Sequence, residues 1–118
     1  MSTPINRPMI AHQERKQLWI GLVEVRALRR SEVLGDGKGA FVNLVTWAAD
    51  ADQFKSNAEL VLGNLGLFIV NIENPEPVSA RRKTAEFEEE VEDMIARAQD
   101  NPDAIIYGTF HTWKRDTA

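Results

Sequence analysis

Two histidines and a run of carboxylates are the side chains of this 118-residue chain best suited to acid–base or metal chemistry. His12 and His111 stand far apart, and no carboxylate close to His111 in the sequence is available to orient it as a general base. Metal sites usually combine several ligands with a pair at close spacing, and the chain has no cysteine to complete such a set. We therefore expect no metal, no cofactor and no catalytic residue.

The carboxylates form one acidic stretch, which consists of Glu86, Glu88, Glu89, Glu90, Glu92 and Asp93. Acid–base catalysis needs paired carboxylates across a cleft that shifts one pKa, whereas these residues follow one another along an expected helix. We interpret most of them as the solvated side of that helix. The functional alternative is an acidic surface that docks on a basic partner.

A glycine-rich segment, Gly35-Asp36-Gly37-Lys38-Gly39, is the one stretch that resembles a phosphate-binding loop. Such a loop requires Ser or Thr after its lysine and a helix after that. Here Gly39 follows Lys38, and the next expected element is a strand. The segment instead predicts a hairpin turn.

The pattern of apolar residues predicts the order strand, strand, helix, strand, helix, strand. The expected strands are 18–28, 40–49, 67–73 and 104–113, and the expected helices are 50–65 and 84–99. Asp50 with Gln53 resembles a capping box, and Gly66 follows the first helix where a positive φ is typical. We expect a single α+β domain over 14–118, preceded by a flexible N-terminal arm over 1–13.

This element order favours a two-layer sandwich. We predict a four-stranded mixed sheet with two helices on one face, a ββαβαβ variant of the ferredoxin-like architecture with its hairpin moved to the front. A swapped form, in which the first hairpin pairs with a neighbouring chain, is the structural alternative.

The three tryptophans, Trp19, Trp47 and Trp113, all fall in expected strands. If both helices share one face, large apolar groups remain on the other face, and water disfavours such a patch. We predict a homodimer across that face. Its expected interface residues are Leu18, Trp19, Ile20 and Trp47. The alternatives are a cover formed by Ile5, Met9 and Ile10 of the arm, or tryptophans that all point into the helix-covered core.

We expect a small, soluble, cytoplasmic, non-enzymatic interaction or regulatory module that acts through the open sheet face or the acidic helix. The alternative is a small-ligand sensor or enzyme whose pocket forms between the sheet face and a partner. Its pocket would be lined by Asn43, Thr46, Tyr107, His111 and Trp113.

Two classes of partner are disfavoured. The net charge is −4, and the basic clusters at 29–30 and 81–83 carry no interleaved aromatic residues, which argues against nucleic acid. The sequence has no run of about 18 apolar residues that would predict a membrane span.

Overall fold

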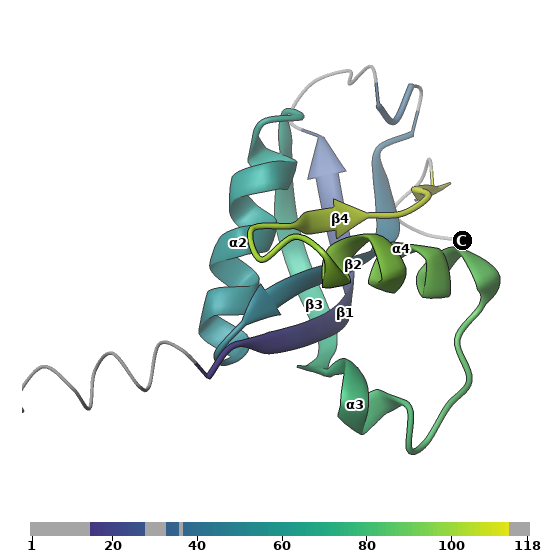
Figure 1. Cartoon of the computed structure of the whole chain (residues 1–118). Helices are drawn as coiled ribbons and strands as arrows, with labels where there is room; N and C mark the ends of the chain where they lie inside the picture. Colours follow the sequence, from purple (N-terminus) through teal and green to yellow (C-terminus); the bar gives the residue numbers. More distant parts are fainter. Residues whose placement is uncertain (1–14, 28–32, 36, 114–118) are drawn as a thin grey trace, which may run out of the picture.

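The computed structural model describes residues 15–27, 33–35 and 37–113, and the predicted arm over 1–13 lies outside them (Figure 1). These residues form β1 (Gln17–Ala27), β2 (Gly39–Ala48), α2 (Ala51–Gly63), β3 (Leu67–Pro77), α3 (Val78–Arg81), α4 (Glu89–Gln99), β4 (Ile105–Tyr107) and β5 (His111–Trp113). The prediction of an α+β fold built from one sheet and packed helices is confirmed. Within the described residues, no helix is long and apolar enough to cross a membrane.

The sheet has the order β3-β1-β2-β4. The fifth strand, β5, also pairs with β2, at residues 39–41, whereas β4 pairs with β2 at residues 44–46. Every pair is antiparallel, so the predicted mixed sheet is wrong. The reason is that the connection through α2 crosses over β1, so β3 pairs with β1 and not with β2. Strands β2 and β3 run in the same direction, but β1 lies between them. This order does not confirm the ferredoxin-like arrangement.

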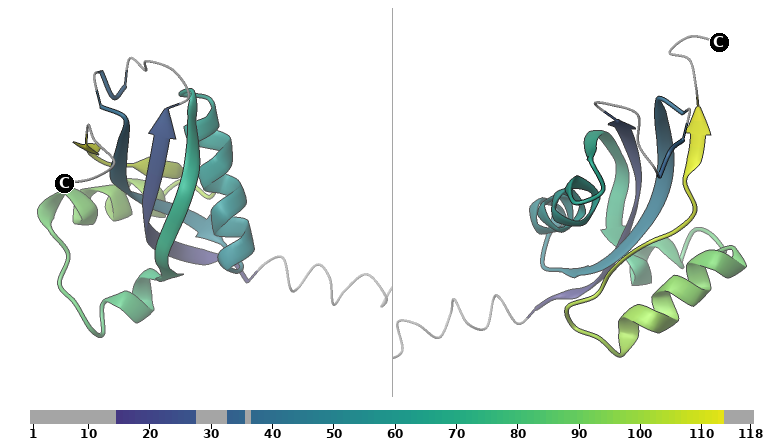
Figure 2. Two further views of the ribbon diagram at one scale, coloured as in Figure 1. Left: turned by 180° about the vertical axis from the view of Figure 1, so that it is seen from behind. Right: turned by 90° about the horizontal axis from the view of Figure 1, so that it is seen from above.

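The two long helices cover opposite faces of the sheet, as the view from above shows (Figure 2). Val23 and Val25 pack with Phe54 of α2 in one core, whereas Leu18 and Ile20 pack with residues of α4 in another. Successive side chains of a strand point to opposite faces, so the two cores lie on opposite sides. The prediction that both helices share one face is therefore wrong.

Helix α2 begins as its sequence predicts. The Asp50 side chain accepts a hydrogen bond from the Gln53 backbone N–H at 2.8 Å, and the Gln53 side chain accepts one from the Ala49 N–H at 2.7 Å. Two backbone donors at the helix start are thus satisfied reciprocally. The helix then buries Phe54, Ala58 and Leu62 on one stripe against the sheet.

Gly66 has a φ of 80° after the end of α2, which confirms the predicted left-handed residue. A Cβ at this position would meet nothing within 4 Å, so the requirement for glycine comes from the backbone alone. We expect Gly66→Val to lower the free energy of unfolding by more than about 1 kcal/mol.

Gly63 supplies the matched control for this prediction, because it lies within α2 and its Cβ would also meet nothing. Gly63→Ala should raise the free energy of unfolding by about 0.5–1 kcal/mol through helix propensity. Urea unfolding of the two variants measures both effects. A Gly66→Val protein as stable as the wild type would contradict the cap.

The second long helix is shorter than the predicted 84–99, because α4 begins at Glu89 and α3 forms a separate turn of helix. The charges account for this start. Glu89, Glu90 and Glu92 lie in the first turn of α4, where the helix dipole favours negative charge. A start at Thr84 would place Arg82 and Lys83 beside the same positive end.

The outer strands of the sheet are irregular. β3 continues through Pro75 and Pro77, which is possible because an edge strand leaves one side of its backbone unpaired. Its register with β1 shifts twice. At the shift between Glu24 and Val25 of β1, Val70 is the extra residue of β3. The predicted strand 104–113 is divided into β4 and β5 around Gly108.

Candidate functional site

The face of the sheet that packs against α4 is covered over only part of its length. Leu18 and Ile20 lie in the core with α4, but side chains farther along the same face belong to neither core. We call this region the open face. The strand register places its residues side by side: Leu22, Glu24, Arg26, Phe41, Asn43, Phe68, Asn71, Glu73, His111 and Trp113. In Figure 1 the arrowhead of β1 extends beyond α4.

Arg26 and Trp113 form one end of the open face. The Arg26 guanidinium lies 5.1 Å from the centroid of the Trp113 ring, a cation–π distance. A Cβ on Gly39 would come within 2.3 Å of that ring, so the indole lies directly against the backbone of β2. The glycine therefore allows a half-buried aromatic side chain to lie flat across the sheet.

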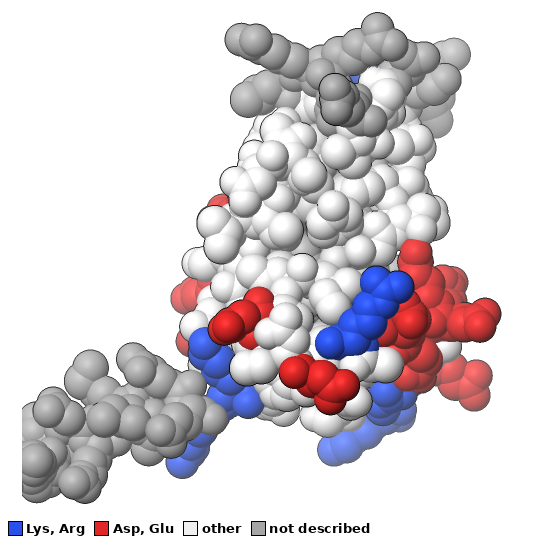
Figure 3. Space-filling model, turned by 45° about the horizontal axis from the view of Figure 1, so that its top comes forward, with Lys and Arg blue, Asp and Glu red and all other residues white. Residues whose placement is uncertain are grey.

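Exposed apolar side chains border the open face on β3. Phe68 is 42% exposed and Val70 is 47% exposed. Phe68 is paired in register with Arg26, and Val70 occupies the irregular position of the strand. Figure 3 shows acidic side chains gathered on the side of α4.

The residues predicted to line a ligand pocket do not come together. Asn43, His111 and Trp113 share the open face, because His111 pairs with Phe41 and Trp113 with Gly39. Tyr107 pairs with Leu44 and so lies on the α2 side of the sheet. The break between β4 and β5 changes the alternation that had placed Tyr107 with His111. Thr46 is buried and donates to the Ala104 carbonyl at 2.9 Å.

The four predicted interface residues pack against the helices of their own chain. Leu18 and Ile20 are buried beneath α4, and the Trp47 Nε1 donates to the Ala98 carbonyl of α4 at 2.8 Å. Trp19 is half-buried in the opposite core with α2. The open face starts farther along β1 than these four residues.

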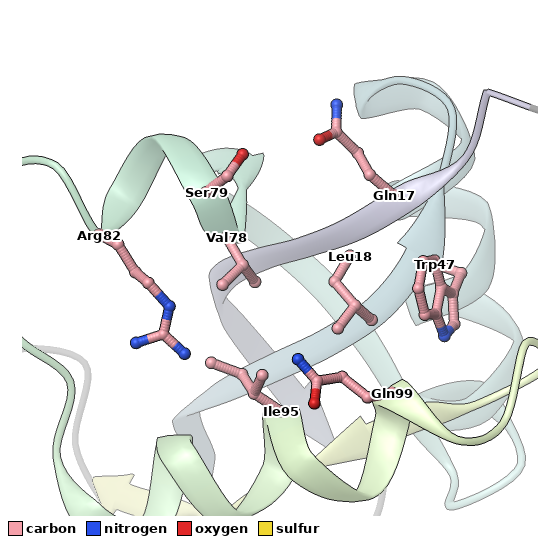
Figure 4. Close-up of a pocket in the computed structure, with 8 residues that line it drawn as sticks. All are labelled: Gln17, Leu18, Trp47, Val78, Ser79, Arg82, Ile95 and Gln99. Atoms are coloured by element: carbon pink, nitrogen blue, oxygen red, sulfur yellow. The ribbon is translucent and has the colours of Figure 1, made fainter.

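A pocket of about 330 Å³ lies between β1, α3 and α4 (Figure 4). Its apolar walls are Leu18, Trp47, Val78 and Ile95. Its polar groups are Gln17, Ser79, Arg82 and Gln99. The pocket is formed by different elements from the predicted site at Tyr107 and His111.

Comparison with known proteins finds no relative. No protein-family model, curated protein or solved structure matches this chain. Among the described residues, no group of three or more His, Asp or Glu side chains is arranged to hold a metal ion.

Glu90 connects α4 to the segment between β4 and β5. Its carboxylate accepts hydrogen bonds from the Thr109 hydroxyl and, at 3.1 Å, from the Thr109 backbone N–H. These hydrogen bonds lower the pKa of Glu90, and the charge of His111 acts in the same direction. Gly108 allows the close approach, since a Cβ there would lie 2.9 Å from the Glu90 Oε1.

The lowered pKa makes this contact sensitive to acid. A carboxylate whose pKa falls on folding stabilises the native state above its unfolded pKa, and this contribution is lost as the pH falls through the folded value. Thr109→Val should raise the pKa of Glu90 toward its ordinary value, because the hydroxyl donor is lost. Thr109→Ser should preserve the lowered pKa. Carbon-13 NMR titration of the Glu90 carboxyl measures both, and an unchanged pKa in Thr109→Val would contradict the assignment.

The strict alternation of side chains between the two faces of a strand did not predict which residues of β3 are exposed. It predicts Phe68, Val70 and Ile72 on one face, but the extra residue in β3 places Ile72 opposite Val23 and Phe68 opposite Arg26. The pocket was missed because α3 was not predicted. The available signal was Val78, an apolar residue that follows Pro77 at a position where a helix can begin.

Proposed function

We propose that this chain is a non-enzymatic protein-interaction module that forms a homodimer through its open face. The observation that carries the proposal is the exposure of Phe68 and Val70 beside a sheet region that belongs to neither core. Burial of apolar surface is the main driving force of protein association. Half-buried Phe41 and Trp113 extend the aromatic character of this surface.

The charges of the open face favour a second copy as the partner. Glu24 and Arg26 are two residues apart on β1, so their side chains point to the same face at a separation of about 7 Å along the strand. A twofold axis near this pair would place Glu24 of each copy beside Arg26 of the other. The Glu24–Arg26 pair is thus complementary to its own copy, and Glu73 beside Leu22 adds one further negative charge to the patch.

Light scattering of the full chain tests the proposal. We expect a mass of twice the 13.3 kDa chain over the micromolar range, since stable interfaces of about 1,200 Å² or more persist at such concentrations. A chain without residues 1–13 should have the same oligomeric state. A full-length monomer that aggregates on this truncation would instead favour a cover formed by the arm and would contradict the homodimer.

A further inference from the structure

The pocket between β1, α3 and α4 is separate from the open face, and its interior is apolar. Leu18, Val78 and Ile95 line it and are each at most 8% exposed. The Trp47 ring forms a further wall, held in place by its hydrogen bond to Ala98. Figure 4 shows Trp47 at one end of the pocket and Arg82 at the other.

Arg82 is fixed in position at its end of the pocket. Its guanidinium donates two hydrogen bonds to the Glu92 carboxylate, at 2.8 and 2.9 Å, and lies 5.0 Å from the centroid of the Phe87 ring. A planar guanidinium held by a carboxylate fork and an aromatic ring is oriented before a ligand arrives. When the carboxylate of a ligand replaces that of Glu92, the Phe87 ring still contacts the guanidinium, so the exchange needs little further ordering of this side chain.

The polar groups around the pocket favour a ligand that accepts hydrogen bonds. Gln17 and Gln99 carry both N–H donors and a carbonyl acceptor, whereas Arg82 carries donors only. The one charged side chain of the lining is Arg82, whose partner Glu92 lies outside the lining. An apolar interior with one cation at its end suits a molecule with an apolar tail and an anionic head.

We propose that this pocket binds a small monocarboxylate with an unbranched apolar tail, and that its carboxylate takes the place of Glu92 on Arg82. The volume of about 330 Å³ corresponds to about ten water volumes. A straight-chain carboxylate with about that number of non-hydrogen atoms, such as octanoate, fills it. The tail packs on Leu18, Val78 and Ile95, and the head accepts two hydrogen bonds from the guanidinium.

Glu92 occupies the guanidinium donors in the free protein, so it acts as an internal competitor. It is about half exposed, and release of its carboxylate to water is possible without unfolding of α4. Removal of its charge should therefore strengthen the binding of a carboxylate, whereas removal of Arg82 should weaken it. A pocket that merely accepts apolar molecules would show neither dependence.

Calorimetric titration of the full chain with octanoate and with octanamide tests this proposal. We expect octanoate to bind with a dissociation constant of about 1 mM or below, and octanamide to bind at least about tenfold more weakly. Arg82→Gln should weaken octanoate about tenfold or more, because a charge-assisted pair is lost. Glu92→Gln should strengthen octanoate several-fold.

Arg97→Gln is the matched control, because Arg97 of α4 also pairs with a carboxylate, that of Asp93 at 2.8 Å, but does not line the pocket. It should leave the affinity for octanoate unchanged. Thermal melting and the NMR shift of the Trp47 indole N–H show whether each variant remains folded and whether the ligand reaches the pocket. Three outcomes would overturn the proposal: no octanoate binding at about 10 mM, equal binding of octanamide, or equal binding by Arg82→Gln.

Discussion

Replacement of Phe68 by glutamate should convert the proposed homodimer into a monomer. The ring is 42% exposed in the single chain and lies opposite Arg26 at the border of the open face. The introduced carboxylate would place a charge in an apolar contact, and a twofold interface would contain two such charges. A loss of at least about 3 kcal/mol, or more than about 100-fold in the dissociation constant, is expected from the burial of these two charges in an apolar contact.

Leu60→Glu is the control for this substitution, because Leu60 is 62% exposed but lies on α2, away from the open face. It introduces the same charge and should leave the dimer intact. Light scattering over a concentration series measures both variants, and thermal melting checks that each is folded. A Phe68→Glu protein that remains dimeric at the wild-type affinity would show that Phe68 is outside the interface.

Replacement of Phe54 by alanine should have the largest effect on stability. Phe54 is fully buried in the core between α2 and the sheet. Its ring contacts β1 at Gly21, where a Cβ would lie only 2.9 Å from the ring carbons. Large-to-small substitutions of buried phenylalanine cost about 3–5 kcal/mol, which is a large part of the stability of a typical domain.

Lys55→Ala is the control, because Lys55 is the exposed neighbour on the same helix. It should change the free energy of unfolding by less than about 0.5 kcal/mol. Urea unfolding compares the two variants. The Gly21 contact gives a second test: Gly21→Ala should destabilise the wild type, but less so when Phe54→Leu removes the ring it would meet. A Phe54→Ala protein of nearly wild-type stability would contradict the packing of α2 on β1.

Local signals predicted most of the elements. The Asp50–Gln53 capping pair, the Phe54–Ala58–Leu62 stripe and the left-handed Gly66 lie within one helix and its ends, and the structure confirms each of them. These features depend on interactions between residues close together in the sequence, so the sequence alone is sufficient to find them.

The arrangement of the helices depended on information that is not local. Leu18, Trp19 and Ile20 are apolar on both faces of β1, and this pattern fits either a partner or a second helix layer. The distance from α2 to α4 along the chain does not specify which face each one covers. The packing of Val91 and Ile95 against Ile20 places α4 on the face that was expected to be free.

The candidate site was hard to predict because single-residue irregularities control it. The extra residue at Val70 separates Phe68 from Ile72, and the break at Gly108 separates Tyr107 from His111. Strict alternation cannot show either event, since one residue more or less reverses the face of every side chain beyond it. The uncovered part of the sheet therefore lies farther along β1 than the residues named from the sequence.

The most direct test of the proposed homodimer is isotope-filtered NMR on an equal mixture of carbon-13-labelled and unlabelled full-length chains. Contacts seen in this experiment arise only between two copies. We expect them to connect the Phe68 ring of one copy with Val70, Leu22 or Trp113 of the other. Intermolecular contacts confined to other elements, or their absence at a concentration where the mass is that of a monomer, would contradict association through the open face.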